Sequence, residues 1–166
     1  MADPGVIIEH PNRSKAASKF TRAFVVLLLL GSAGLVAIIS IGGWSALEGA
    51  KFLQIAYIVV YLVLAVFVLR WSRGVLPLAA ALAIVLLIFA AVSTPAWFDR
   101  DKNGFTDPAL PADVLGLLTA LVVPVQLLLI AFAMSGFRQA WNVEIERHQE
   151  PPPDRSEHRG PTPAAA

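Results

Sequence analysis

The sequence contains no cysteine among its 166 residues. This absence excludes disulfide bonds, thiolate metal ligands and cysteine nucleophiles. Charge is also scarce, because only 15% of the residues are Asp, Glu, Lys or Arg, whereas about a quarter is usual in a soluble domain. The net charge of +1 shows no excess of one sign, so we expect no nucleic acid among the partners of this chain.

Ionisable residues are missing above all from the middle of the chain. Four long apolar runs, with charge only at their ends, cover residues 23–47, 52–70, 74–97 and 113–137. A helix needs roughly 20 apolar residues to cross a bilayer, and a lone segment in hydrocarbon can satisfy its backbone only as a helix. The sequence therefore predicts an all-α fold, an antiparallel four-helix transmembrane bundle with short loops and the lipid bilayer as its surroundings.

The first run has the basic start of a signal peptide, which is the alternative interpretation. Its apolar stretch is longer than the roughly 7–15 residues of such a segment, and no small-x-small cleavage site follows promptly. We therefore expect it to be a span.

Lysine and arginine predict the orientation, since they are enriched in short cytoplasmic loops. Ten of the thirteen lie in the two tails and in the loop between the second and third runs, and only three lie in the other two loops. The sequence therefore predicts a multi-pass protein of the cell (plasma) membrane with both termini in the cytoplasm.

The tails differ in composition from the spans. We divide the chain into an irregular cytoplasmic tail at 1–13, a helical transmembrane domain at 14–145, and a disordered, proline-rich cytoplasmic tail at 146–166. Phe137, Trp141 and Ile145 recur at the i, i+4 spacing of a helix, so we expect the last helix to extend beyond the membrane surface. All four tryptophans lie near predicted span ends, where an indole ring suits the membrane interface.

Small residues predict how the helices pack. Close approach at small side chains drives association in lipid, where burial of leucine does not. Gln126 lies near the middle of the fourth run, where its amide is expected to bond across helices. The small residues expected at the contacts are Ala33, Ala37 and Ser40 in the first run, Ala79, Ala83 and Ala90 in the third, and Gly116 and Ala120 in the fourth.

The lack of ionisable residues at depth bears directly on function. Such residues are the usual marks of proton relays and ion pathways, and no nucleophile has a base nearby in the sequence. We therefore expect no enzyme, but an accessory or scaffold subunit or a homo-oligomer, with itself or another membrane protein as partner. The alternative is a small transporter or channel with a path lined by Ser93, Thr94, Pro124 and Gln126. A third and weaker alternative is an enzyme that acts on lipids through loop acids and a divalent ion.

One outer loop resembles part of the calcium loop of an EF-hand. That loop places oxygen ligands at positions 1, 3, 5, 7 and 9, glycine at position 6, and a bidentate Glu at position 12. Here position 6 is Gly104, but position 12 is Leu110, so the last carboxylate is missing. The resemblance implies a weak calcium site, and the alternative is an ordinary Asp/Asn/Gly turn. The predicted ligands are Asp99, Asp101, Asn103, the carbonyl of Phe105, and Asp107.

Overall fold

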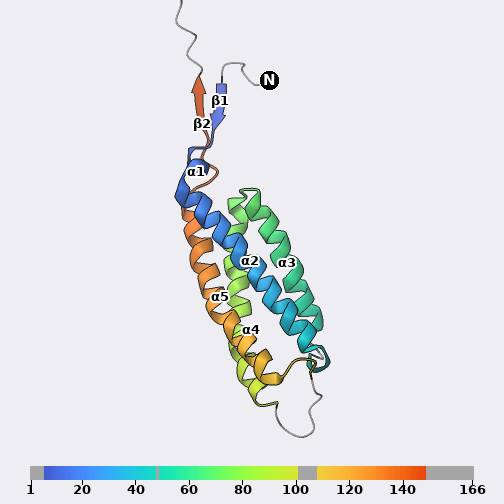
Figure 1. Cartoon of the computed structure of the whole chain (residues 1–166). Coiled ribbons are helices and arrows are strands. Elements are labelled where there is room, and N and C mark those ends of the chain that lie inside the picture. Colours follow the sequence, from blue (N-terminus) through green and yellow to red (C-terminus); the bar gives the residue numbers. More distant parts are fainter. Residues whose placement is uncertain (1–5, 48, 101–107, 149–166) are drawn as a thin grey trace, which may run out of the picture.

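A computed structural model of the chain describes residues 6–47, 49–100 and 108–148. Four long helices form a bundle (Figure 1). Each is long and apolar enough to cross a membrane, which confirms the four predicted spans as helices. The four are α2 (Ala16–Gly42), α3 (Lys51–Leu69), α4 (Leu76–Phe98) and α5 (Ala112–Arg138).

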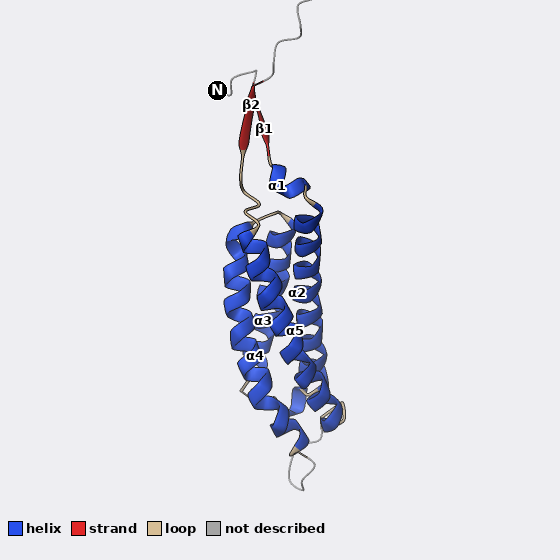
Figure 2. Ribbon diagram, turned by 90° about the vertical axis from the view of Figure 1, so that its left-hand side faces the viewer, coloured by secondary structure: helices blue, strands red, loops and turns tan. Residues whose placement is uncertain are grey.

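The helices do not contact one another equally. α2 packs on both α3 and α5, and α5 packs closely on α4, whereas α3 and α4 contact each other much less. Figure 2 shows the same bundle from the side. The weak contact between α3 and α4 leaves the space that is described below as a cavity.

Hydrogen bonds between segments mark which helix ends lie together. The Leu110 amide donates to the Gly42 carbonyl at 3.1 Å, so the end of α2 lies beside the start of α5. At the other end of the bundle, the Arg22 guanidinium donates to the Leu69 carbonyl at 3.1 Å, so the start of α2 lies beside the end of α3. The first and the last described residues of the chain both lie at the Arg22 end of the bundle (Figure 1).

The described parts of the tails differ from the prediction. Instead of an irregular segment, the N-terminal tail holds strand β1 (Val6–Glu9) and a short helix α1 (Pro11–Ser14). β1 pairs antiparallel with β2 (Ile145–His148), so that Val6 faces His148 and Glu9 faces Ile145. This two-stranded sheet lies beyond the end of the bundle (Figures 1 and 2). The remaining residues of the predicted disordered tail, 149–166, lie outside the described residues.

The last helix is also shorter than predicted. α5 ends at Arg138, and Ala140 adopts a left-handed backbone with φ of 50°. A left-handed residue is a common helix terminator, although it is usually glycine. Beyond Ala140, Val143 and Ile145 alternate with polar residues, and this alternation is the spacing of a strand. The segment forms a strand here, although its i, i+4 spacing had predicted a helix.

The predicted small-residue stripes lie at helix contacts. Ala33, Ala79, Ala83 and Ala90 are buried, and a Cβ added at Gly116 would meet the Phe98 ring at 2.8 Å. These observations confirm that the stripes mark packing faces. Ala37 and Ala120 are only half-buried, and therefore lie at the margin of those faces.

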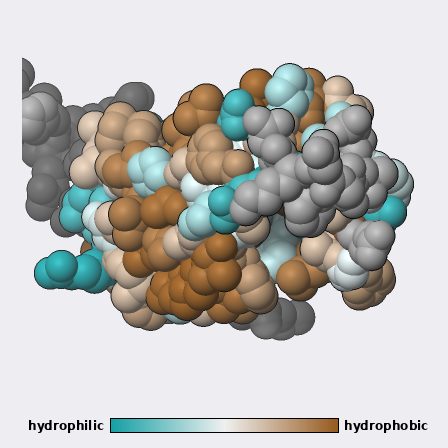
Figure 3. All heavy atoms as spheres, turned by 90° about the horizontal axis from the view of Figure 1, so that it is seen from below, coloured by the Kyte–Doolittle hydropathy of each residue, from teal (hydrophilic) through white to brown (hydrophobic). Residues whose placement is uncertain are grey.

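The outer surface of the bundle is apolar to an extent that is unusual in water. Phe52 is 84% exposed, and Ile41 and Val92 are each 73% exposed. Figure 3 looks along the bundle from the end opposite the strands and shows apolar residues gathered on its sides. Soluble monomers rarely expose such large contiguous apolar surface. The surface is suited to lipid.

Candidate functional site

A chain of hydrogen bonds crosses the centre of the bundle. The Tyr61 hydroxyl donates to Gln126 Oε1 at 3.0 Å, and Gln126 Nε2 donates to Ser32 Oγ at 2.9 Å. Ser32 in turn donates to the Leu28 carbonyl at 2.7 Å. The side chains of Tyr61, Gln126 and Ser32 are completely buried. The chain joins α3, α5 and α2, which confirms the expectation that Gln126 bonds across helices.

A cavity of about 250 Å³ lies between this network and the end of the bundle that carries the loop at 43–50. Its floor is formed by α2 and α5, through residues such as Val36 and Val122. Its walls are α3 and α4, and Leu53 and Phe89 line it from these two helices. These two side chains are also 43% and 49% exposed, so the cavity opens sideways between α3 and α4.

The polar groups of this cavity are uncharged. Ser93 donates its hydroxyl hydrogen to the Phe89 carbonyl at 2.7 Å, and Thr119 does the same to Leu115 at 2.7 Å. Tyr57 reaches across to α4, where its hydroxyl lies 3.5 Å from the Leu82 carbonyl. None of the described residues that line the cavity is Asp, Glu, Lys, Arg or His.

A further polar contact lies at the outer end of the cavity. Gln54, which lines it, is hydrogen-bonded to Ser40 of α2. Ser40 also donates to the Val36 carbonyl at 2.6 Å. The contact ties the first turns of α3 to the last turns of α2, and so closes the side of the cavity opposite α4.

The structure does not bring together the four residues that the sequence suggested as the lining of a transport path. Ser93 lines the cavity, but Gln126 is enclosed in the central network. Pro124 lies on the exposed side of α5, and the Thr94 hydroxyl donates to the Ala90 carbonyl of its own helix at 2.7 Å. The structure therefore brings only Ser93 to the cavity.

The predicted calcium ligands fall largely outside the described residues. Asp99 directly follows α4, whereas Asp101, Asn103, Phe105 and Asp107 belong to the segment 101–107, which is not described. Among described residues, no group of three or more His, Asp or Glu is close enough to hold a metal. The calcium site stays a prediction.

The start of that loop is fixed to the neighbouring loop. The Arg100 guanidinium donates to the Ala46 carbonyl at 3.1 Å and lies over the Trp97 ring, 5.2 Å from its centre. Asp113 lies in the first turn of α5, after an N-cap at Pro111. There its negative charge interacts favourably with the helix dipole.

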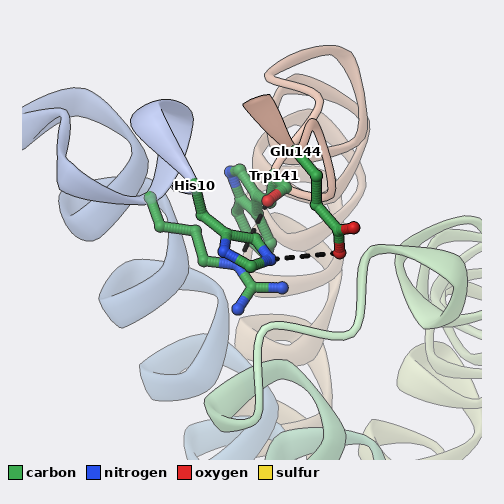
Figure 4. A network of polar contacts seen from close by, with 4 residues as sticks. His10, Trp141 and Glu144 are labelled. Atoms are coloured by element: carbon green, nitrogen blue, oxygen red, sulfur yellow. Dashed lines mark hydrogen bonds and ion pairs between the residues drawn. The ribbon is translucent and has the colours of Figure 1, made fainter. Parts of the chain in front are cut away.

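At the other end of the bundle, the two tails form a joint structure that we call the terminal cap, residues 6–14 and 139–148. The imidazole of His10 lies 3.3 Å from the Glu144 carboxylate, and Figure 4 shows the two side chains facing each other beside Trp141. Arg13 Nε donates to the Trp141 carbonyl at 3.1 Å, and Asn12 donates to the Ala140 carbonyl at 3.0 Å.

Trp141 is the anchor of the terminal cap. Its ring is completely buried, and its indole N–H donates to Gln139 Oε1 at 3.0 Å. Gln139 in turn donates to the Thr21 hydroxyl of α2 at 2.9 Å. Trp97 is also buried, so two of the four tryptophans pack inside the bundle rather than at its lipid-facing surface.

Sequence reasoning missed the terminal cap, although a signal for it was present. Trp141, Val143 and Ile145 alternate with polar residues, and Val6, Ile7 and Ile8 form a β-branched run in the opposite tail. Both patterns favour strands. The sequence does not reveal that these two segments, which are more than 130 residues apart, pair with each other.

No family model, curated protein or solved structure matches the chain.

Proposed function

We propose that this chain is a small, non-enzymatic, multi-pass membrane protein that acts as an accessory or scaffold subunit, in complex with itself or with another membrane protein. In this proposal the bundle is antiparallel and spans the plasma membrane, with both termini in the cytoplasm. The observation that carries the proposal is the terminal cap, in which the two described tails pair with each other outside the apolar helices.

The orientation is supported by position and charge. β1 and β2 lie at one end of the bundle (Figure 1), and the loop between α3 and α4, with Arg70 and Arg73, lies at the same end. Ten of the thirteen basic residues belong to the two tails and this loop. The positive-inside rule therefore supports a cytoplasmic location for that end.

The scaffold role is supported by the rigidity of the bundle. Each hydrogen-bonding group in the chain from Tyr61 through Gln126 to Ser32 has a partner, and satisfied buried networks hold helices in one arrangement. The terminal cap is attached to this bundle through Gln139, which donates to the Thr21 hydroxyl of α2. A fixed surface outside the membrane suits the docking of a partner, since little ordering is needed on binding.

The test is the mass of the protein extracted from its native membrane in a mild detergent. We expect a uniform complex heavier than the 17.8 kDa chain, with cross-links formed from a cysteine placed at Val143. The double variant N12A/R13A removes two of the bonds to residues 140 and 141, and we expect it to lose the complex while the helices persist. K15A is the control, because Lys15 is exposed. A chain that runs as a monomer without any partner contradicts the proposal.

A small transporter is the second candidate, and the cavity with Ser93 is the observation that favours it. The test uses single cysteines, which the chain allows because it has none of its own. A transport path requires that a charged thiol reagent labels a cysteine at the buried Ser32, whereas a closed scaffold leaves that position unlabelled.

A further inference from the structure

We infer that the cavity between α3 and α4 binds an uncharged amphipathic lipid of the alcohol class, such as a monoacylglycerol. Its hydroxyl-bearing head would lie near Ser93 and Thr119, and its hydrocarbon chain near Leu86 and Val122. The inference rests on the proposed membrane location, because the ligand enters from the bilayer.

The position of the opening selects a ligand from the lipid phase. Leu53 and Phe89 flank the cavity and belong to the exposed apolar surface of α3 and α4. These two helices contact each other less than the other neighbouring pairs do. A molecule that diffuses within the bilayer therefore meets the opening directly, without crossing the polar ends of the bundle.

The size of the cavity fits part of a lipid rather than a water molecule. An apolar cavity of about 150 Å³ stays dry and takes up a molecule as large as benzene. The present cavity has about 250 Å³, so it accommodates a small head group together with several methylene groups.

The distribution of polar groups gives the ligand its direction. Gln54, Ser93 and Thr119 lie within two turns of the helix ends near the loop at 43–50, whereas Leu86 and Val122 lie deeper in the bundle. The head of an amphipathic lipid therefore faces the surface of the membrane, and its chain points toward the middle.

The polar groups also select the kind of head. The hydroxyl hydrogens of Ser93 and Thr119 are donated to their own helices, so that their oxygens remain as acceptors. A hydroxyl group of the ligand can donate to these oxygens, so it matches this set.

A charged head does not match it. No described lining residue carries a charge, and burying an ion without a partner is costly. The hydrocarbon chain gains nothing by exchanging lipid tails for apolar side chains. Selectivity must therefore come from the hydroxyl groups of Ser93 and Thr119.

The experiment uses the full chain in nanodiscs with a photoactivatable monoacylglycerol, and the labelled residues are located by mass spectrometry. We expect labels on Leu53 and Phe89, reduced at least tenfold by excess unlabelled monoacylglycerol but not by phosphatidylglycerol. A90L fills the cavity and should abolish the competed label, while A91L, which is exposed on the same helix, should keep it. Melting of both variants shows whether they fold.

S93A provides a second test that changes only the head-group contact. We expect it to weaken competition by monoacylglycerol several-fold, while competition by a hydrocarbon without a hydroxyl group stays as weak as before. Labels spread evenly over the lipid-facing surface, or unchanged in A90L, overturn the inference while leaving the scaffold proposal intact. Failure of the chain to enter nanodiscs at all overturns both.

Discussion

The indole ring of Trp71 meets that of Trp141 edge-on, with the ring centres 5.4 Å apart and the planes at 85°. Trp71 follows α3 and Trp141 follows α5, so this contact joins two turns that are distant in sequence. The Arg22 guanidinium lies over the Trp71 ring, 4.1 Å from its centre, and adds α2 to the cluster. The terminal cap is therefore attached to three of the four long helices.

Replacement of Trp141 by alanine should destabilise the protein strongly. The ring is completely buried, and removal of such a ring typically costs about 3–5 kcal/mol. Thermal unfolding in detergent measures the change. W44A is the control, because Trp44 is 47% exposed and its loss should cost far less. Equal destabilisation by the two variants contradicts the anchoring role of Trp141.

Replacement of Ala140 by glycine should stabilise the protein. Ala140 has a φ of 50°, and a non-glycine residue in this region is strained by about 1–2 kcal/mol. Glycine relieves the strain and removes only one methyl group. A131G is the matched control, since Ala131 is exposed within α5 and glycine there should cost about 1 kcal/mol. A lower melting temperature for A140G contradicts the left-handed backbone conformation of Ala140.

The central hydrogen-bond chain predicts coupling between Tyr61 and Gln126. Y61F removes the donor to Gln126 Oε1 and should cost about 0.6–2 kcal/mol, the range for such bonds between membrane helices. Q126L leaves the buried Tyr61 hydroxyl without its acceptor and should also destabilise. In the double variant the second change should cost less than it does alone. Additive costs mean that the two side chains do not interact.

The calcium prediction is tested by melting with and without the ion. If the loop binds weakly, millimolar Ca²⁺ should raise the melting temperature, since a ligand of the folded state stabilises it. D101A should remove this shift. D113A should keep it, because Asp113 lies in the first turn of α5, outside the predicted ligand set. Absence of any shift in the native chain ends the calcium hypothesis.

The four helices follow from the sequence because lipid leaves the backbone no other solution. The role of Gln126 followed for a similar reason, since a buried amide requires partners. Its partners, Tyr61 and Ser32, lie 65 and 94 residues away, and no local pattern identifies them. The cavity was equally inaccessible to sequence reasoning, because it results from the loose contact between α3 and α4.

The terminal cap shows where periodicity misleads. Phe137, Trp141 and Ile145 satisfy a helical spacing, but Trp141 and Ile145 also satisfy the alternation of a strand. When a helical and a strand spacing overlap in so short a segment, pairing with a distant part of the chain, here with β1, determines which of the two forms. The left-handed residue Ala140 carries no sequence signal, since alanine is a strong helix former.

Labelling of single cysteines in intact cells tests the proposed topology most directly. Cysteines are placed at Ser14 and Val143 near the two chain ends, and at Gly49 in the opposite loop, where each position is exposed. With a maleimide that does not cross membranes, Gly49→Cys should react in intact cells, and the other two only after the cells are opened. Reaction of Ser14→Cys and Val143→Cys from opposite sides of the membrane, or extraction of the chain without detergent, contradicts the four-span bundle.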